Sequence, residues 1–426
     1  METPESVIKY ISDQFEKPTP IQSYAIPYVL AERDVIGIAP TGSGKTLAYM
    51  LPIVAKLKAS RKEKPRLKTV IVAPTKELSR QLFREILVLT EGTGLKIHLL
   101  SKDSYEAKVW RKTYDVLIAT PLNLVHKLDT KTLKSIKYLV LDEADQLFEL
   151  GFADQIDSIL RQCTHKSQVK LMFSATMLPS VEILVKTIMV DPVHLAIGSK
   201  NAAVSSISQE LKFCSTEQGK MIALQQMIAE GSLSPPVLVF VQSKHRAKEL
   251  FTEIVSQNVR VGMVHSDMTV TERDKAIKNF RLGYVWVLIC TDLMARGIDF
   301  KGVNLVINYD FPQSMVAYIH RVGRTGRAGE GGRAVTFYTY EDAPYLKIVA
   351  HVMSMSGIQV PEWITKLHGK GRKDRKQLIK KPVRREKISS KPKLTRSLRK
   401  HLKKKKDAAK GPALQEAQGQ QEPQEA

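Results

Sequence analysis

The sequence has few cysteines and lacks long apolar stretches. Its three cysteines, Cys163, Cys214 and Cys290, are an odd number far apart in the chain. An odd count without paired spacing argues against a disulfide framework and predicts reduced thiols in an intracellular protein. No apolar run reaches the length of a membrane span, and the N-terminus lacks a hydrophobic signal segment. We therefore expect a soluble protein with no membrane partner.

Acidic residues are outnumbered, because 43 Asp and Glu stand against 66 Lys and Arg, which gives a formal net charge of +23. The excess is local: from Lys366 onward, 21 Lys and Arg accompany 6 Asp and Glu. This charge predicts a polyanionic partner. Lys403–Lys406 is unbroken lysine and apolar periodicity ends after Trp363, so we predict that residues 366–426 form a disordered Lys-rich tail. Nuclear import and salt-sensitive tethering to a polyanion are both compatible with this tail.

The remaining chain alternates short β-branched runs with amphipathic segments. This alternation predicts mostly parallel sheets covered by helices on both faces. A small and polar stretch at 197–207 is a linker candidate, so we expect two α/β domains, residues 1–200 and 206–365. The expected strands are Val35–Ala39, Thr69–Ala73, Ile97–Leu100, Val116–Ala119, Tyr138–Leu141, Val169–Phe173, Val193–Ala196, Ile207–Phe213, Val237–Val241, Val261–Val264, Val285–Cys290, Leu305–Asn308 and Ala334–Tyr338.

A Gly-rich turn, Ala39-Pro-Thr-Gly-Ser-Gly-Lys-Thr46, lies between the first expected strand and a helix start. Backbone N–H groups of such a turn and the helix N-terminus can face one anion together. Lys45 adds a positive charge, and Thr46 offers a hydroxyl to Mg²⁺. Ala39 occupies a place where the usual pattern has glycine, which leaves an ordinary Gly-rich turn as the alternative.

Two carboxylates, Asp142 and Glu143, follow the strand Tyr138–Leu141. Near a phosphate turn, one carboxylate can hold Mg²⁺ and the other can orient or deprotonate a water molecule. The alternative is a solvated acidic turn after a buried strand.

Three arginines, Arg321, Arg324 and Arg327, are spaced three residues apart. On a helix this spacing places the guanidinium groups near one face, where an anion would relieve their repulsion. A γ-phosphate held by the first domain would do so, which makes Arg324 and Arg327 candidate arginine fingers. An Arg-rich helix paired with local carboxylates is the alternative, although only Glu330 follows closely.

These segments resemble the DEAD-box RNA helicase family over about Phe15 to Trp363. Asp142-Glu-Ala-Asp145, Ser174-Ala-Thr176 and His320–Arg327 stand in the family's order and spacing. The resemblance implies two tandem RecA-like domains, ATP and Mg²⁺ as cofactors, and RNA-stimulated ATP hydrolysis.

Finer details are similar to the branch that matures small-subunit ribosomal RNA. They are Val237–Ser243, Asp299–Gly302 and the Lys-rich tail. That similarity implies a monomer in the nucleus and nucleolus that acts on a ribosomal RNA precursor, with pre-ribosomal assembly proteins as further partners.

The resemblance also implies site roles. Catalysis would involve Lys45, Asp142, Glu143, Arg324 and Arg327, with Mg²⁺ on Thr46 and Asp142. The nucleotide would contact Phe15, Gln22, Ala39, Pro40, Thr41, Gly42, Ser43, Gly44, Lys45, Thr46, Gly297 and Asp299. Asp145, Ser174, Thr176 and His320 would couple hydrolysis to domain closure, and Thr75, Lys76, Gly94, Thr120, Pro121 and Thr291 would touch RNA. Composition alone instead favours a domain-entry loop around Phe15 and Gln22.

The sequence departs from the family pattern at several places. An upstream aromatic that usually stacks on adenine is absent, as expected of a fragment or short isoform. Lys76 replaces a usual Arg and loses its bidentate fork. Asn123 and Val270 replace a usual Arg and Gln, so we expect the affinity for RNA to be weaker or altered. Two rival functions remain open: an ATP-gated RNA clamp or assembly scaffold, and a DNA helicase.

Overall fold

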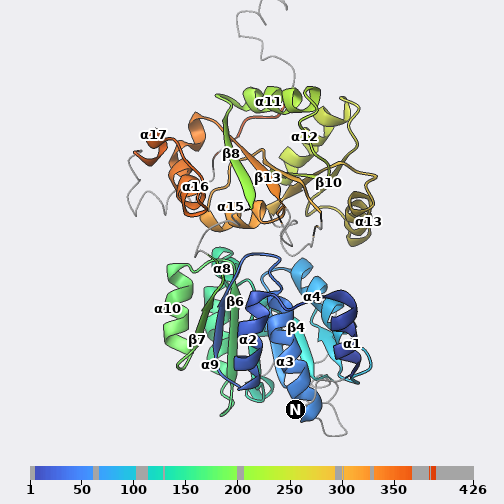
Figure 1. Cartoon of the computed structure of the whole chain (residues 1–426), viewed down its shortest axis with the longest axis vertical. Helices are drawn as coiled ribbons and strands as arrows, with labels where there is room; N and C mark the ends of the chain where they lie inside the picture. The colour runs from blue at the N-terminus through green and yellow to red at the C-terminus, as the bar shows by residue number, and fades with distance from the viewer. Residues whose placement is uncertain are drawn as a thin grey trace, which may run out of the picture.

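The structure is a computed structural model that describes residues 5–60, 67–101, 114–127, 130–198, 206–292, 300, 302–326, 331–366, 383 and 385–389. The described chain forms two lobes stacked along the long axis of the molecule (Figure 1), each built around one sheet. Every strand pairing in these ranges is parallel. The predicted α/β class is confirmed.

The first lobe holds a seven-stranded sheet in the order β3-β4-β2-β5-β6-β1-β7. Its strands are β1 (Val35–Ile38), β2 (Thr69–Val72), β3 (Ile97–Leu99), β4 (Val116–Ala119), β5 (Tyr138–Leu141), β6 (Val169–Ser174) and β7 (Val193–Ala196). Its helices are α1 (Glu5–Gln14), α2 (Pro20–Leu30), α3 (Lys45–Ala59), α4 (Lys76–Leu89), α6 (Pro121–Lys127), α7 (Thr130–Leu133), α8 (Ala144–Glu149), α9 (Ala153–Gln162) and α10 (Pro179–Ile188).

The second lobe holds a six-stranded sheet in the order β10-β11-β9-β12-β13-β8. Its strands are β8 (Ile207–Phe213), β9 (Val237–Val241), β10 (Val261–Val264), β11 (Val287–Thr291), β12 (Leu305–Asn308) and β13 (Gly332–Tyr338). Its helices are α11 (Glu217–Ala229), α12 (Lys244–Val255), α13 (Val270–Arg281), α15 (Met315–Val322), the short 3₁₀ helix η1 (Tyr340–Asp342), α16 (Ala343–Met355) and α17 (Glu362–Thr365).

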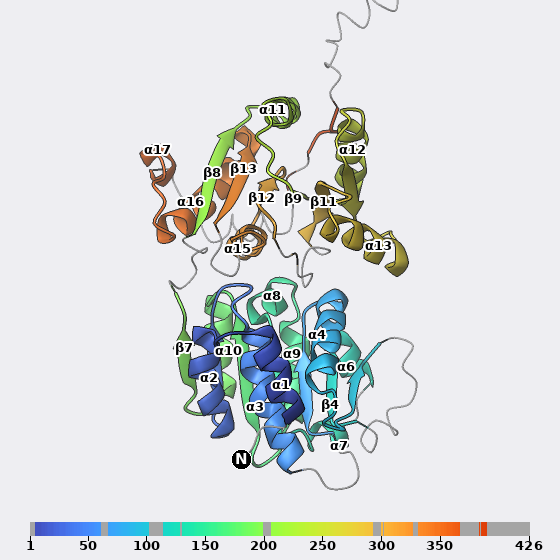
Figure 2. The ribbon, with the colours of Figure 1, turned by 45° about the vertical axis from the view of Figure 1, so that its right-hand side comes forward.

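The two sheets repeat one topology. The order of β8–β13 is that of β1–β6, and β7 is an additional edge strand beside β1. Each expected strand is present, with ends that differ by two residues or fewer. The carboxyl ends of parallel strands meet at one edge of a sheet, which is where ligands bind in such folds. That edge of the first sheet lies toward the second lobe (Figure 2).

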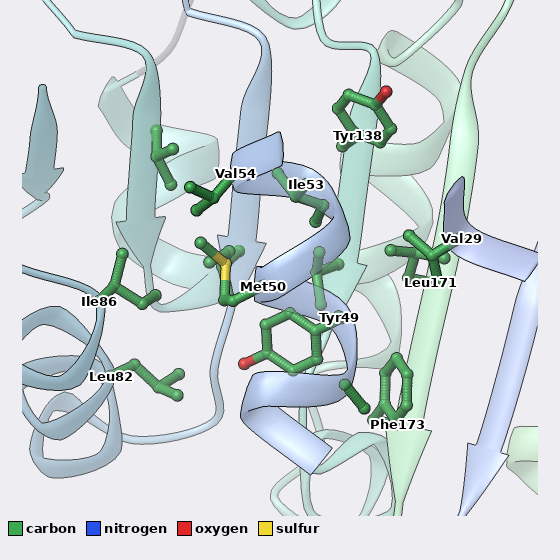
Figure 3. Packing of buried hydrophobic residues seen from close by; sticks show 14 of the residues in the cluster. Val29, Tyr49, Met50, Ile53, Val54, Leu82, Ile86, Tyr138, Leu171 and Phe173 are labelled. Atoms are coloured by element: carbon green, nitrogen blue, oxygen red, sulfur yellow. The ribbon is translucent and has the colours of Figure 1, made fainter. Parts of the chain in front are cut away.

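Helix α3 fixes the position of the first lobe's Gly-rich turn. Its buried face carries Tyr49, Met50, Ile53 and Val54, which pack between the sheet and helix α4 (Figure 3). Burial of one such side chain contributes on the order of 1.5–3 kcal/mol. The start of α3 is therefore held at the carboxyl edge of the sheet by its apolar packing.

The three cysteines are buried and free, in agreement with the expectation of reduced thiols. Among the described residues, none of the helices is both long and apolar enough to span a bilayer. Six residues of the predicted disordered tail beyond Lys366 are placed in the structure. Val383 and Arg385–Ser389 pack on the second lobe, where Ile388 is 3% exposed. For these six residues the prediction of disorder is wrong, because they supply both apolar and charged contacts. The other residues of the tail after Lys366 lie outside the described ranges.

Gly37 allows β1 and β6 to pack closely beside α3. It pairs with Phe173, and a Cβ atom at this glycine would lie 2.5 Å from the Phe173 ring. We predict that Gly37→Ala lowers the free energy of unfolding by about 1–3 kcal/mol, because the ring must move within a packed core. Urea denaturation monitored by circular dichroism measures this change. Gly331→Ala is the matched control, since its Cβ has no described atom within 4 Å, and equal stability losses would contradict the packing argument.

Candidate active site between the lobes

The Gly-rich turn is built as a strand, a tight turn and a helix. It joins β1 to α3, and Gly42 and Gly44 adopt φ values of 80° and 87°. These values favour glycine because a Cβ atom strains the left-handed region. Lys45 Nζ donates hydrogen bonds to the carbonyl oxygens of Ala39 and Pro40 at 2.6 and 2.9 Å. The ammonium group is thus held over the turn itself.

Gln22 connects the N-terminal segment to this turn. Its Nε2 donates to the Gly44 carbonyl at 3.2 Å, and its Oε1 accepts from the Thr19 N–H at 2.9 Å. Thr19 caps helix α2, so the side chain of Gln22 is fixed at both ends. Phe15 follows α1 and is 45% exposed. The segment lies against the predicted phosphate turn, whereas its role in adenine binding stays a prediction.

Asp142 is a buried carboxylate at the end of β5. Its Oδ2 accepts from the Tyr49 hydroxyl at 3.0 Å, and its Oδ1 accepts from the Glu143 N–H at 2.9 Å. Burial, followed by repulsion from Glu143, raises the pKa of Asp142 to about 7, although Lys45 opposes this shift. Sequence reasoning missed Tyr49, because a tyrosine on an apolar helix face is indistinguishable from a core residue.

Glu143 has an unusual backbone conformation for a non-glycine residue, with φ at 46°. Among the described residues, its buried Oε2 has no hydrogen-bond partner. A buried carboxylate oxygen without a partner requires water, a proton or a cation. The oxygen donors Asp142 and Thr46 are of the kind that Mg²⁺ prefers. The residues present therefore fit a magnesium ion with a water molecule beside Glu143.

Asp145 joins the two lobes. Its Oδ2 accepts from the Thr176 N–H and hydroxyl at 3.0 and 2.8 Å, and His320 Nε2 of α15 lies 3.1 Å away. Gln146 Nε2 contacts the other ring nitrogen, Nδ1 of His320, at 3.0 Å. Ser174 completes the network, since its hydroxyl accepts from the Asp145 N–H and donates to the Thr176 carbonyl. The four predicted coupling residues are therefore in one buried cluster.

The charge state of Asp145 is maintained by this cluster. Burial alone would raise its pKa, but His320, Thr176 and Ser174 outweigh burial and lower the pKa to about 2. A lowered folded pKa means that the carboxylate stabilises the fold above its unfolded value near 3.9. That contribution is lost as pH falls toward 2.

Other contacts cross between the lobes without any sequence signal. Thr41 Oγ1 of the Gly-rich turn donates to the Gly323 carbonyl at 3.2 Å. Arg273 Nη1 of α13 pairs with Glu77 Oε1 of α4 at 2.5 Å, and both side chains are mostly buried. Ser314 hydrogen-bonds Glu149. Sequence reasoning missed these pairs, because their partners are more than 160 residues apart.

The prediction that three arginines share one helix face is wrong. Helix α15 ends at Val322, because Gly323 is its C-cap and Gly326 takes a φ of 65°. The guanidinium group of Arg321 makes its contacts within the second lobe. It donates to the Asp292 carboxylate at 2.7 Å and to the Asp310 carbonyl at 2.7 Å.

Arg324 follows the helix end in the turn that contacts Thr41 through Gly323. It is 4% exposed, and its Nε donates to the His320 carbonyl at 3.1 Å. The turn that carries Arg324 is thus in contact with the Gly-rich turn. The predicted site residues Arg327, Gly297 and Asp299 lie outside the described residues.

Most predicted RNA-contact residues lie at carboxyl ends of strands. Thr75 caps α4 by accepting from the Leu78 N–H, and Lys76 is exposed beside it. Thr120 follows β4, Pro121 begins α6, and Thr291 ends β11. The predicted position of Gly94 among these residues is wrong. Gly94 precedes β3 by three residues, and the carbonyl of its neighbour Thr93 accepts from Lys58 near the end of α3. It therefore lies at the opposite, amino edge of the sheet and cannot join Thr75 and Thr120.

Comparisons with known proteins agree with this geometry. Residues 19–184 match the DEAD/DEAH box helicase family, and residues 219–329 match the helicase conserved C-terminal domain. The chain is 46% identical over 390 residues to a probable ATP-dependent RNA helicase, DDX52, of Rattus norvegicus, with 89% of this chain and 65% of that protein covered. It is 44% identical over 425 residues to the ATP-dependent RNA helicase ROK1 of Eremothecium gossypii, with 96% and 74% covered. The chain thus spans about two thirds of the rat relative's length.

Solved structures match across both lobes. Dbp5 of S. cerevisiae, bound to RNA and ADP BeF3, has a TM-score of 0.71 at 29% identity, with 88% of this chain and 97% of that chain covered. Mss116p, bound to ssRNA and AMP-PNP, also gives 0.71, at 26% identity with 85% and 78% covered. The fold defines a protein with two tandem RecA-like lobes of the helicase type. The chain belongs to the DEAD-box family of ATP-dependent RNA helicases.

The raised pKa of Asp142 predicts pH-dependent binding of Mg²⁺-nucleotide. The carboxylate must be ionised to hold a cation, and half of it is protonated near pH 7 in the free protein. We expect affinity for Mg²⁺-ADP to rise about tenfold from pH 6 to pH 8, and to level off above. Calorimetry in buffers of different ionisation enthalpy would also detect the released proton.

Two variants test this assignment. Asp142→Asn should bind weakly with a flatter pH profile, which separates the carboxylate from titration of the nucleotide. Tyr49→Phe removes a hydrogen bond to the ionised form, so the midpoint should move to higher pH. An unchanged profile in both variants would show that another group titrates.

Proposed function

We propose that this chain couples ATP binding and hydrolysis to the local opening of structured RNA. We also propose that residues 1–200 form its ATP-binding helicase domain and residues 206–365 its C-terminal helicase domain. One observation carries the proposal: Asp145, beside the catalytic candidates Asp142 and Glu143, is bonded to His320 on the opposite lobe. Chemistry at one lobe is thereby connected to the position of the other.

The residues have distinct tasks in hydrolysis. Lys45 neutralises phosphate charge, and Glu143 orients the attacking water and accepts its proton. When bound on Thr46 and Asp142, Mg²⁺ supplies charge neutralisation to the phosphates. Arg324 stabilises charge that develops on the transferred phosphoryl group. Arg327, Gly297 and Asp299 are proposed to complete the site from the second lobe.

RNA and ATP are coupled because both require the closed arrangement of the lobes. The contacts from Asp145 to His320 and from Thr41 to Gly323 form only when the lobes meet. A ligand that bridges the lobes lowers the ordering cost for the other ligand, and this coupling is reciprocal. Hydrolysis and phosphate loss weaken the bridge and release RNA. Similarity to structures bound to RNA together with a nucleotide analogue supports this reading.

The RNA contacts are proposed to be independent of base sequence. Thr75, Thr120 and Thr291 lie at or just after the carboxyl ends of strands, the edge at which ligands bind in such sheets, and their proposed partners are sugar and phosphate groups. Such contacts position a strand but carry little base information. Discrimination against DNA would then rest on 2′-hydroxyl groups. We propose a ribosomal RNA precursor as substrate and the nucleolus as location, supported by the resemblance in Val237–Ser243 and by the basic tail. Crosslinking to cellular RNA tests this assignment.

The variant Glu143→Gln tests the hydrolytic role. The amide keeps the shape of the side chain but cannot accept a proton, so we expect binding of ATP and RNA within about threefold of the unmodified protein. Steady-state ATP hydrolysis should fall by a factor on the order of 100 or more. Phosphate release in single and multiple turnovers measures both effects. Normal multiple turnover would remove Glu143 as the base.

The rival functions require separate measurements. A duplex-release assay in a single turnover distinguishes an unwinding enzyme from an RNA clamp, because only the former releases the strand after ATP addition. ATPase stimulation by RNA and DNA of matched length and sequence distinguishes the RNA helicase from a DNA helicase. Equal stimulation by both would favour the DNA helicase reading.

A further inference from the structure

The second lobe contains a buried charged cluster at the topological position of the nucleotide site in the first. Because the two sheets share one strand order, β8 corresponds to β1 and β12 to β5. The first lobe has Lys45 after β1 and Asp142 after β5. The second lobe has Lys220 in the helix after β8, and Asp310 two residues after β12. A lysine and an aspartate thus lie at the same edge of both sheets, but the residues around them differ between the two lobes.

Three carboxylates dominate this edge of the second sheet. Glu217, Asp310 and Asp342 are between 0% and 5% exposed. Lys220 and Arg246 are enclosed with them: Lys220 Nζ lies 2.8 Å from Glu217 Oε1, and Arg246 pairs with Asp310 at 2.6 Å. The two cations leave one negative charge unbalanced, which is costly in a buried place.

Arg385 of the C-terminal segment balances that charge. Its side chain is 1% exposed. Nη2 lies 2.7 Å from Asp342 Oδ1, Nη1 lies 3.1 Å from Glu217 Oε1, and Nε donates to Gln242 Oε1 at 2.9 Å. Three acceptors around one guanidinium group match the planar fork of arginine better than the point charge of lysine.

The segment around Arg385 crosses the edge of the sheet and is fastened on both sides. Val383 packs on the apolar cluster at one face, and Ile388 is buried in the cluster at the other. Its backbone is also bound: the Val383 carbonyl accepts from Gln242, the Glu386 carbonyl accepts from Arg246, and the Ile388 N–H donates to Glu249. Figure 2 shows the short red-brown stretch beside helix α12.

We propose that this edge of the second lobe is a receptor site for an arginine-bearing peptide segment, and that Val383 and residues 385–389 of the same chain are its occupant. Glu217, Asp310 and Asp342 recognise the guanidinium, and an apolar recess receives Ile388 three residues later. The segment acts as a strap across the second lobe that connects the apolar clusters on the two faces of its sheet. This inference does not depend on the helicase activity.

Thermal unfolding of the full chain tests the strap. Arg385→Ala leaves a buried carboxylate unpaired, so we expect the melting temperature of the second lobe to fall by about 5–10 °C. Arg385→Lys keeps the positive charge but lacks the planar guanidinium group, so it should recover part of the lost melting temperature. Lys387→Ala is the matched control: it removes one positive charge from the same segment, but Lys387 is exposed. Equal melting of the unmodified protein, Arg385→Ala and Lys387→Ala would overturn the proposal.

A peptide in trans tests the recognition itself. The probe is a fluorescent peptide of residues 381–391, added to the full chain with Arg385→Ala and Ile388→Asp. We expect it to bind this variant at least tenfold more tightly than the unmodified chain, whose site is filled. The same peptide with Arg385→Ala should bind neither the variant chain nor the unmodified chain. Equal binding of both peptides, or equal affinity for both chains, would show that the edge does not select arginine.

Discussion

The carboxylate of Asp145 is the interaction on which the closed arrangement depends. It is fully buried, yet ionised, because Thr176 and His320 supply hydrogen bonds from two different lobes. A buried ionised group is tolerated only when its hydrogen bonds are made, so the two lobes cannot separate without exposing it to water. Asp145, which lies beside the catalytic candidates Asp142 and Glu143, therefore also makes the contact that depends on the position of the second lobe.

The fold could be predicted from the sequence to a large extent. β-branched runs in fully buried parallel strands leave a clear signal, and each expected strand is present within two residues of its expected ends. The Gly-rich turn was also recognisable as a turn, because Gly42 and Gly44 adopt a backbone conformation that is strained for other residues. Local sequence contains this information, since strand burial and turn geometry are decided within a few residues.

The site was less predictable where it depends on distant partners. The helix expected through Arg327 stops at Val322, because two glycines outweigh the three-residue spacing of the arginines. The family resemblance placed Gly94 among the RNA contacts, whereas the chain after α4 brings it to the opposite edge of the sheet. Arg385 could not be distinguished from its basic neighbours, since Glu217 is 168 residues away. Pairs of this kind are visible only once the chain is folded.

Duplication of one topology has given the two lobes opposite electrostatic character at corresponding edges. In the first lobe, this edge carries the Gly-rich turn and Lys45, where we propose that the nucleotide phosphates bind. In the second, the same edge presents three carboxylates that enclose Arg385. The cations Lys220, Arg246 and Arg385 are already balanced by these carboxylates, so this cluster offers a triphosphate no net positive charge. The second lobe is therefore suited to contribute to the proposed nucleotide site from outside, and not to hold a nucleotide of its own at this edge.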